Sequence, residues 1–178
     1  MRGSNIYIRA FTEKDTDALL KLQTENRAFF EAFAMDRSED FYTRETQVKR
    51  IEQFAEDIEH GKGYYMGIFK KDDHFLVGTI NLFSVLRGSL QTAFLGYFLD
   101  EKHNGRGFTT EAVKLMVRFA FDELKLHRIE AGVMPRNLAS IRVLEKSGFH
   151  KEGIAKSNVR INGKWEDHQV LAIINPAD

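Results

Sequence analysis

Hydrophobic residues recur along this chain in two rhythms, one typical of strands and one typical of helices. Ile6 and Ile8 share one face of a short extended segment over residues 5–10. Near-continuous apolar runs at residues 64–69, 75–83 and 92–99 are joined by short turns, which predicts an antiparallel meander covered on both faces. Gly96, inside the third run, favours a bulge or a close backbone approach.

Helical periodicity and capping residues mark the segments between and after these strands. Thr12 and Thr43 are candidate N-caps of two helices that follow the first strand. An aromatic-rich stretch with Phe29, Phe30 and Phe33 lies between them, and simple core packing accounts for these rings. A long amphipathic helix is predicted over residues 109–125.

The last third of the chain completes the pattern. A strand over residues 128–134 leads to a helix that Asn137 caps and Gly148 ends. Asn162 and Gly163 then join two closing strands as a hairpin. The resulting order, β-α-α-β-β-β-α-β-α-β-β, predicts the α/β (α+β) class, with a mixed, largely antiparallel sheet and helices on both faces.

Composition limits the kind of protein this chain can be. It has 178 residues, only two prolines and no low-complexity linker, so we expect a single domain over residues 1–178. Cysteine is absent, which excludes disulfides, a thiol nucleophile and Cys-ligated metals, and fits a cytoplasmic location. No apolar run approaches the ~20 residues of a membrane span, so we expect no membrane partner.

Charge is balanced overall but unevenly distributed. The 26 basic and 26 acidic side chains give no net charge, which argues against nucleic acid as a direct partner. Residues 1–60 hold 9 basic and 13 acidic side chains, and residues 61–178 hold 17 and 13. A polyanionic small ligand would favour the second part, although random scatter over two solvated faces is the alternative.

The loop before the long helix is the most informative segment. Gly105 and Gly107 let its backbone turn several N–H groups toward one point, and the following helix adds its free N–H groups and dipole. Such a concavity binds phosphate. Phe108 stands where a P-loop needs Lys, and Thr110 where a dinucleotide fingerprint needs a third glycine. A plain strand–helix turn remains the simpler alternative.

Two motifs in register resemble one enzyme family. Residues 102–107 resemble the acetyl-CoA loop Gln/Arg-x-x-Gly-x-Gly/Ala of the GNAT (GCN5-related) N-acetyltransferases, with Lys102 in place of the usual Gln or Arg. Residues 137–149 resemble that family's second motif, Asn-x-x-Ser followed by Lys-x-Gly-Phe. The order of predicted elements matches the family over essentially the whole chain.

The resemblance implies where acetyl-CoA binds. The strands over residues 92–99 and 128–134 would splay apart and hold pantetheine between them. The implied cofactor-binding residues are Phe98, Leu99, Asn104, Gly105, Arg106, Gly107, Phe108, Thr109, Asn137, Ser140 and Lys146. An N-cap role accounts for Asn137 without any ligand, and local hydrogen bonding does so for Ser140.

The resemblance also implies chemistry. Ser140 would donate a proton to the departing CoA thiolate as the catalytic residue. Leu144 occupies the place of the tyrosine acid found in many of these enzymes, and leucine cannot donate a proton. This arrangement resembles the RimJ/RimL-type branch, which acetylates N-terminal amines of ribosomal proteins. The Asn26-Arg27 step followed by an aromatic helix resembles that branch's substrate side.

Several expectations follow with their alternatives. Direct transfer of acetyl from acetyl-CoA to a protein N-terminal amine is the leading function. A small-molecule amine acetyltransferase, or a non-catalytic CoA-binding sensor or scaffold, is the alternative. Glu25, Glu101 and Glu111 are candidate bases without a motif. The histidines lack metal-ligand spacing, so no metal is expected, and His103 is expected to be exposed. Exposed aromatics leave room for a homo-oligomer.

Overall fold

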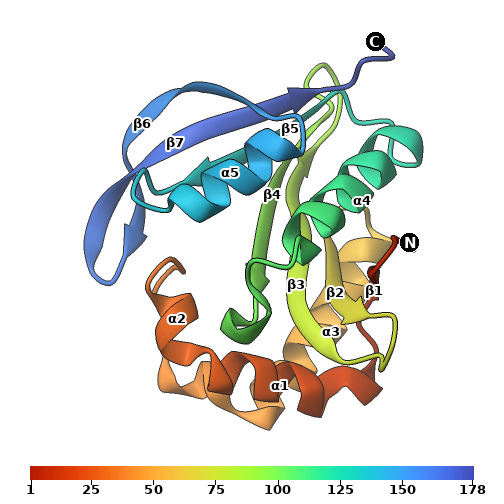
Figure 1. Ribbon diagram of the computed structural model, residues 1–178, viewed down its shortest axis with the longest axis vertical. Coiled ribbons are helices and arrows are strands. Elements are labelled where there is room, and N and C mark those ends of the chain that lie inside the picture. Colours follow the sequence, from red (N-terminus) through yellow and green to blue (C-terminus); the bar gives the residue numbers. More distant parts are fainter.

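The computed structural model describes residues 1–178, and its centre is one sheet of seven strands (Figure 1). The strands lie in the order β1-β2-β3-β4-β5-β7-β6, and every neighbouring pair is antiparallel except β4 with β5. Their bounds are β1 Ile6–Ala10, β2 Tyr64–Lys70, β3 Leu76–Leu86, β4 Thr92–Leu99, β5 Arg128–Val133, β6 His150–Ile161 and β7 Lys164–Ile174. The predicted mixed, largely antiparallel sheet is confirmed.

Helices cover both faces of this sheet, as predicted (Figure 1). On the face of α4 and α5, 25 buried residues form the larger apolar cluster, whereas the cluster under α1 and α3 has 7. The helices are α1 Thr16–Glu25, α2 Arg27–Glu31, α3 Arg44–Glu59, α4 Phe108–Asp122 and α5 Leu138–Lys146. No helix combines the length and the apolar character that crossing a membrane requires.

The sequence predicted two helices after the first strand, and the structure has three. The side chain of Asn26 is responsible, because its Nδ2 donates to the Leu22 carbonyl at 3.0 Å at the end of α1. The chain then restarts as the short α2. The Oδ1 of Asn26 accepts from the Glu101 amide at 2.9 Å, and the residue is only 5% exposed. This single buried amide therefore connects the α1–α2 junction to the loop after β4.

Two glycine predictions have different outcomes. Asn162 and Gly163 both have positive φ, 50° and 75°, as the predicted two-residue hairpin between β6 and β7 requires. Gly96 does not form a bulge, because its pairing with Asn81 of β3 is in regular register. A Cβ at Gly96 would come within 3.3 Å of the Phe83 ring, so the close approach is by a side chain and not by the backbone that the sequence suggested.

Candidate active site

The parallel strands β4 and β5 separate after a short paired segment. Only residues 92–94 of β4 pair with residues 128–130 of β5. Both strands continue beyond that point, so their facing backbone edges lack strand partners (Figure 1). The predicted splayed strand pair is confirmed, and it leaves hydrogen-bonding groups available to a ligand.

A cleft of about 820 Å³ occupies this separation. Most of the predicted binding residues line it: Phe98, Leu99, Asn104, Gly105, Gly107, Phe108, Thr109, Asn137, Ser140 and Lys146. Arg106 is the exception, because its side chain is exposed and lies outside the lining. The side chains of Phe29, Phe30, Tyr97, Arg136, Arg142, Leu144 and His168 also line the cleft. Phe30 therefore belongs both to the core and to the cleft.

The loop between β4 and α4 is a cradle of free backbone donors. The N–H groups of residues 105–110 have no acceptor within the protein. Gly105 and Gly107 have φ of 76° and 78°, and a Cβ at either would meet nothing within 4 Å, so the concave side is open. The 15-residue α4 begins here and adds the positive end of its dipole. This geometry suits an anion such as a pyrophosphate.

His103, expected to be exposed, is instead part of the loop's support. Its side chain is only 16% exposed, and its Nδ1 lies 2.8 Å from the buried carboxylate of Asp100. The imidazole also packs between the rings of Phe75 and Phe108. Asp100 further accepts from the Lys102 amide. These contacts hold the loop from behind, which leaves its amides free on the cleft side.

Asn137 is the N-cap of α5, and it also lines the cleft. Its Oδ1 accepts from the Ser140 amide at 3.2 Å, as the capping interpretation predicted. Its Nδ2 makes no hydrogen bond within the protein, so it remains available to a ligand. The capping role and the predicted pantetheine contact are therefore compatible.

Tyr97 is the residue that sequence reasoning missed. Its Oη lies 2.7 Å from Ser140 Oγ and donates to the Ser140 carbonyl at 3.2 Å. Burial raises the pKa of Tyr97 to about 12, although the hydrogen bond with Ser140 acts in the opposite direction. The phenol is therefore protonated throughout the neutral range. Leu144, where many of these enzymes have a tyrosine, is fully buried, and its side chain has no proton that it could donate.

None of the three predicted candidate bases reaches the cleft. The Glu111 carboxylate accepts from the Asn5 backbone and side-chain amides and from the Ile6 amide, so it holds the N-terminal segment. Glu25 pairs with Lys21 on the surface, and Glu101 is exposed outside the lining. The cleft lining contains no carboxylate at all.

His168 is the residue of the cleft lining whose side chain offers a nitrogen as a proton acceptor. This buried β7 residue packs beside Gly132 of β5, where a Cβ would lie 3.5 Å from its ring. Its Nδ1 lies 3.2 Å from the Glu166 carbonyl, and donation there leaves Nε2 as a free acceptor. A residue at Gly132 with a side chain would crowd this imidazole. The sequence carried no signal for it beyond the presence of a histidine in the last strand.

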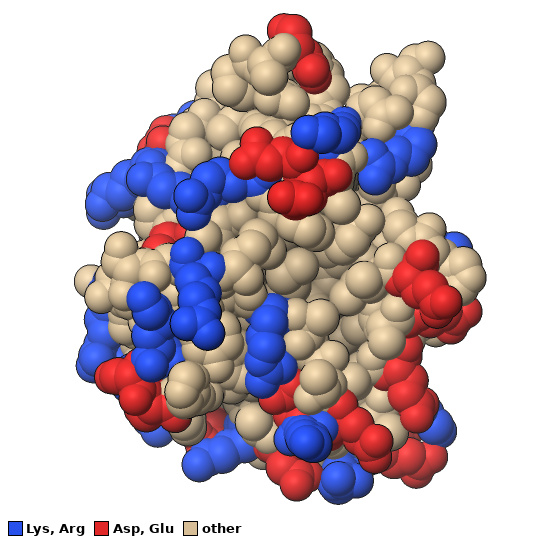
Figure 2. Space-filling model, turned by 90° about the vertical axis from the view of Figure 1, so that its right-hand side faces the viewer, with Lys and Arg blue, Asp and Glu red and all other residues tan.

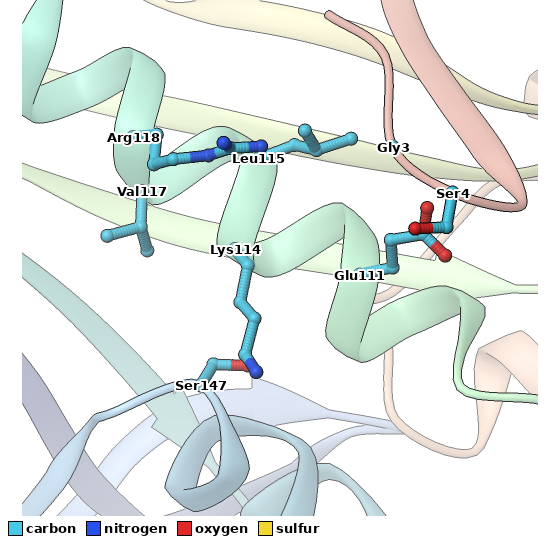
Figure 3. Close-up of a pocket in the computed structure, with 8 residues that line it drawn as sticks. All are labelled: Gly3, Ser4, Glu111, Lys114, Leu115, Val117, Arg118 and Ser147. Atoms are coloured by element: carbon cyan, nitrogen blue, oxygen red, sulfur yellow. The ribbon is translucent and has the colours of Figure 1, made fainter.

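A second hollow, of about 460 Å³, lies along the outer side of α4 (Figure 3). Figure 3 shows the Glu111 side chain directed toward Gly3 and Ser4, and Lys114 directed toward Ser147. On the face that Figure 2 shows, more Lys and Arg side chains lie toward the left and more Asp and Glu toward the right. Glu111 in this hollow holds the N-terminal segment, and the other charged groups there are basic, so the hollow has no free proton acceptor. We therefore look for the proton-transfer groups in the cleft.

Comparison with known proteins identifies the family. The family model described as an acetyltransferase (GNAT) domain matches residues 5–150 of this sequence. The chain belongs to the GNAT acetyltransferase family. A probable N-acetyltransferase of Bacillus subtilis (strain 168), YjcK, is 61% identical over 178 residues, which is 100% of this chain and 98% of that protein. The resemblance seen in the loop and helix motifs is thereby confirmed.

Solved structures agree with this assignment. The ribosomal-protein-S5-alanine acetyltransferase of Vibrio fischeri superposes with a TM-score of 0.94 and 31% identity, covering 99% of this GNAT chain and 96% of that one. Mycobacterium smegmatis RimJ, solved in complex with CoA-disulfide, has a TM-score of 0.90 and 26% identity. The match covers 95% of this chain and 81% of that one. The free amides of residues 105–110 and the unpaired strand edges fit such a ligand in this GNAT enzyme.

Replacement of Gly107 by Trp tests the position of the phosphate cradle. The ring would fill the open side of the loop, so we expect acetyl-CoA affinity to fall by about a hundredfold, as loss of several charge-assisted hydrogen bonds implies. Isothermal titration with acetyl-CoA measures the effect. Gly88→Trp is the matched control, because Gly88 also has a positive φ and an open surrounding but lies outside the cleft. Equal affinity in both variants would contradict the placement.

Proposed function

We propose that this GNAT acetyltransferase transfers acetyl from acetyl-CoA to the free α-amine of a protein N-terminus, with ribosomal proteins as the first acceptors to test. Transfer is direct, within a ternary complex, because the chain has no cysteine to form a thioester intermediate. The names of two similar structures, a ribosomal-protein-S5-alanine acetyltransferase and RimJ, support this acceptor class. We also propose that the enzyme acts in the cytoplasm.

The charge of the cleft is the observation that carries the choice of acceptor. Its lining has no Asp or Glu, whereas Arg136, Arg142 and Lys146 line it. A polyamine carries several positive charges and would find no carboxylate to bind there. An N-terminal α-amine has a pKa of about 7.7–8.0, against about 10.4 for lysine, so a useful fraction is already neutral at pH 7. Such an acceptor needs positioning more than strong base catalysis.

In the proposed mechanism, bound acetyl-CoA supplies the acetyl thioester, and residues on two sides of the split sheet handle protons. His168 Nε2 accepts a proton from the acceptor ammonium before attack. Ser140 Oγ donates a proton to the departing sulfur. The second proton, which the attacking nitrogen loses after the C–N bond forms, replaces the one that Ser140 gives, and the protonated Tyr97 Oη, 2.7 Å away, positions the Ser140 hydroxyl. Backbone N–H groups of the open β4 edge polarise the acetyl carbonyl.

An acceptor panel distinguishes the functions. We expect CoA thiol release with peptides that have free N-termini, and none with the same peptides after N-acetylation or with polyamines and aminoglycosides. A thiol-reactive dye follows the release, and mass spectrometry locates the added acetyl. Turnover of the small amines alone would overturn the proposal. Tight acetyl-CoA binding without any turnover would instead favour a sensor or scaffold.

Ser140→Ala tests the proton donor. General acid catalysis contributes about a hundredfold or more, so we expect kcat to fall by that order while affinity for acetyl-CoA changes little. Ser147→Ala is the matched control, since Ser147 follows the same helix, donates to the Val143 carbonyl and does not line the cleft. An unaltered kcat in Ser140→Ala with a good peptide would remove Ser140 from the mechanism.

His168→Asn tests the proton acceptor while keeping a donor toward the Glu166 carbonyl. We expect kcat/KM for a peptide to fall about tenfold near pH 6.5, where most of the α-amine is protonated. The difference should shrink toward pH 9, because the amine there is already neutral. His150→Asn, at an exposed imidazole, serves as the control. A loss that is the same at every pH would indicate a purely structural role.

A further inference from the structure

Two arginines that share the Phe41 ring lack the acidic partners that other arginines of this chain have. Arg27 pairs with Glu31 and Glu39, Arg136 with Glu166, and Arg160 approaches Asp36. By contrast, Arg37 donates to Gln23 Oε1 at 3.1 Å, and Arg50 donates to Gln47 Oε1 at 2.7 Å. Neither forms an ion pair, so both positive charges are left without a counter-ion.

Neutral glutamines at these two positions are notable because both are buried. Gln23 is 2% exposed and Gln47 is 0% exposed, and each presents an amide oxygen where a carboxylate of nearly the same shape would neutralise the arginine. Burying a cation without a counter-ion costs free energy, so a chain selected only for stability would favour Glu. The arrangement keeps the positive charge available to something outside the protein.

The guanidinium groups are held by aromatic rings. Arg37 and Arg50 lie 4.3 Å and 4.5 Å from the centroid of the Phe41 ring, and Arg50 also lies 5.2 Å from that of Phe54. Cation–π contacts of this kind hold a charge in place without neutralising it. Burial, with the nearby charge of Arg37, lowers the pKa of Arg50 to about 10, which still leaves it charged at neutral pH.

Neither arginine lines the cleft itself, but Arg37 lies next to a residue that does. Arg37 is 5.4 Å from the centroid of the Phe98 ring, and Phe98 lines the cleft. Phe54 stacks on Tyr65 of β2, which pairs with Asn81 of β3, and Asn81 in turn pairs with Gly96 of β4. Gly96 has no side chain, and the ring of Phe83 lies 3.3 Å from the place of its Cβ. The side chain of Asn81 makes no hydrogen bond within the protein, and the residue is half-buried.

We propose that Arg37 and Arg50 form a recognition site for a carboxylate on the amine acceptor. Guanidinium groups bind carboxylates through paired, charge-assisted hydrogen bonds, and both groups still have donors to offer. The inference rests on the proposed function, which it makes more specific: the favoured acceptor carries a carboxylate close to its reactive amine. An acidic side chain near a peptide N-terminus provides this group, and so does the α-carboxylate of a free amino acid.

The experiment compares matched acceptors that differ only in this charge. Short C-terminally amidated peptides with a free N-terminus carry one Glu at successive positions, each beside the same peptide with Gln. We expect the native enzyme to prefer Glu over Gln at one position by about tenfold in kcat/KM, as interfacial ion pairs do. Arg37→Gln and Arg50→Gln should lower that ratio toward one. A second arm compares free amino acids with their carboxamides.

Controls separate recognition from folding. Arg44→Gln removes an exposed arginine of the same helix as Arg50, one paired with Asp17, and should leave the Glu/Gln ratio unchanged. Arg37→Lys and Arg50→Lys retain the charge without the planar fork, and we expect ratios between those of the native and Gln forms. Circular dichroism and thermal melting verify that each variant is folded. If one Gln variant fails to fold, its Lys counterpart and the other arginine decide the question.

Each outcome bears on a different statement. Equal turnover of Glu and Gln peptides at every position, with no preference among the amino acids, would overturn the carboxylate site and leave N-terminal acetylation intact. Turnover of no peptide at all would overturn the proposed function. The carboxylate site would then stand only if free amino acids are preferred over their carboxamides and Arg37→Gln abolishes that preference.

Discussion

The early parting of β4 and β5 is the constraint on which the rest of this structure depends. A sheet normally satisfies every backbone donor and acceptor in its interior, and here two central strands stop pairing after residues 92–94 and 128–130. The sheet survives because each strand keeps its other neighbour: β4 remains paired with β3, and β5 with β7 along its whole length. The split is thus held open by the β3–β4 and β5–β7 ladders on its two sides, which makes the cleft a fixed feature of the fold.

The loop at the end of β4 is shaped by contacts on its outer side. Asn26 holds the Glu101 amide, and Asp100 holds His103, which packs against Phe108 at the start of α4. These bonds stabilise the turn without using the amides of residues 105–110. A phosphate-binding loop needs this division, because donors that satisfy one another are lost to the ligand.

The sequence predicted local features well and distant contacts poorly. Asn137 at a helix start, the Asn162-Gly163 turn and the glycines of the loop act through neighbouring backbone, so their roles are visible in a linear pattern. The splayed strands and the cleft followed only from family resemblance. The contact of Tyr97 with Ser140 spans 43 positions, and no local signal announces it. His103 was expected to be exposed because its packing depends on Phe75, far along the chain. The carboxylates of Glu25, Glu101 and Glu111 can accept a proton, but all three residues lie outside the cleft lining.

The split also explains how two reactants meet without obstructing each other. Tyr97 packs with the cluster under α4 and α5, whereas the next residue, Phe98, packs with the cluster under α1 and α3, because side chains alternate along a strand. In the proposed mechanism Ser140 therefore donates its proton to the leaving sulfur from the α5 face. The acceptor amine approaches the opposite face, where Arg37 lies against Phe98. A continuous sheet would separate these groups by a layer of paired backbone. Where β4 and β5 part, that layer is missing, and direct transfer between two bound substrates becomes geometrically possible.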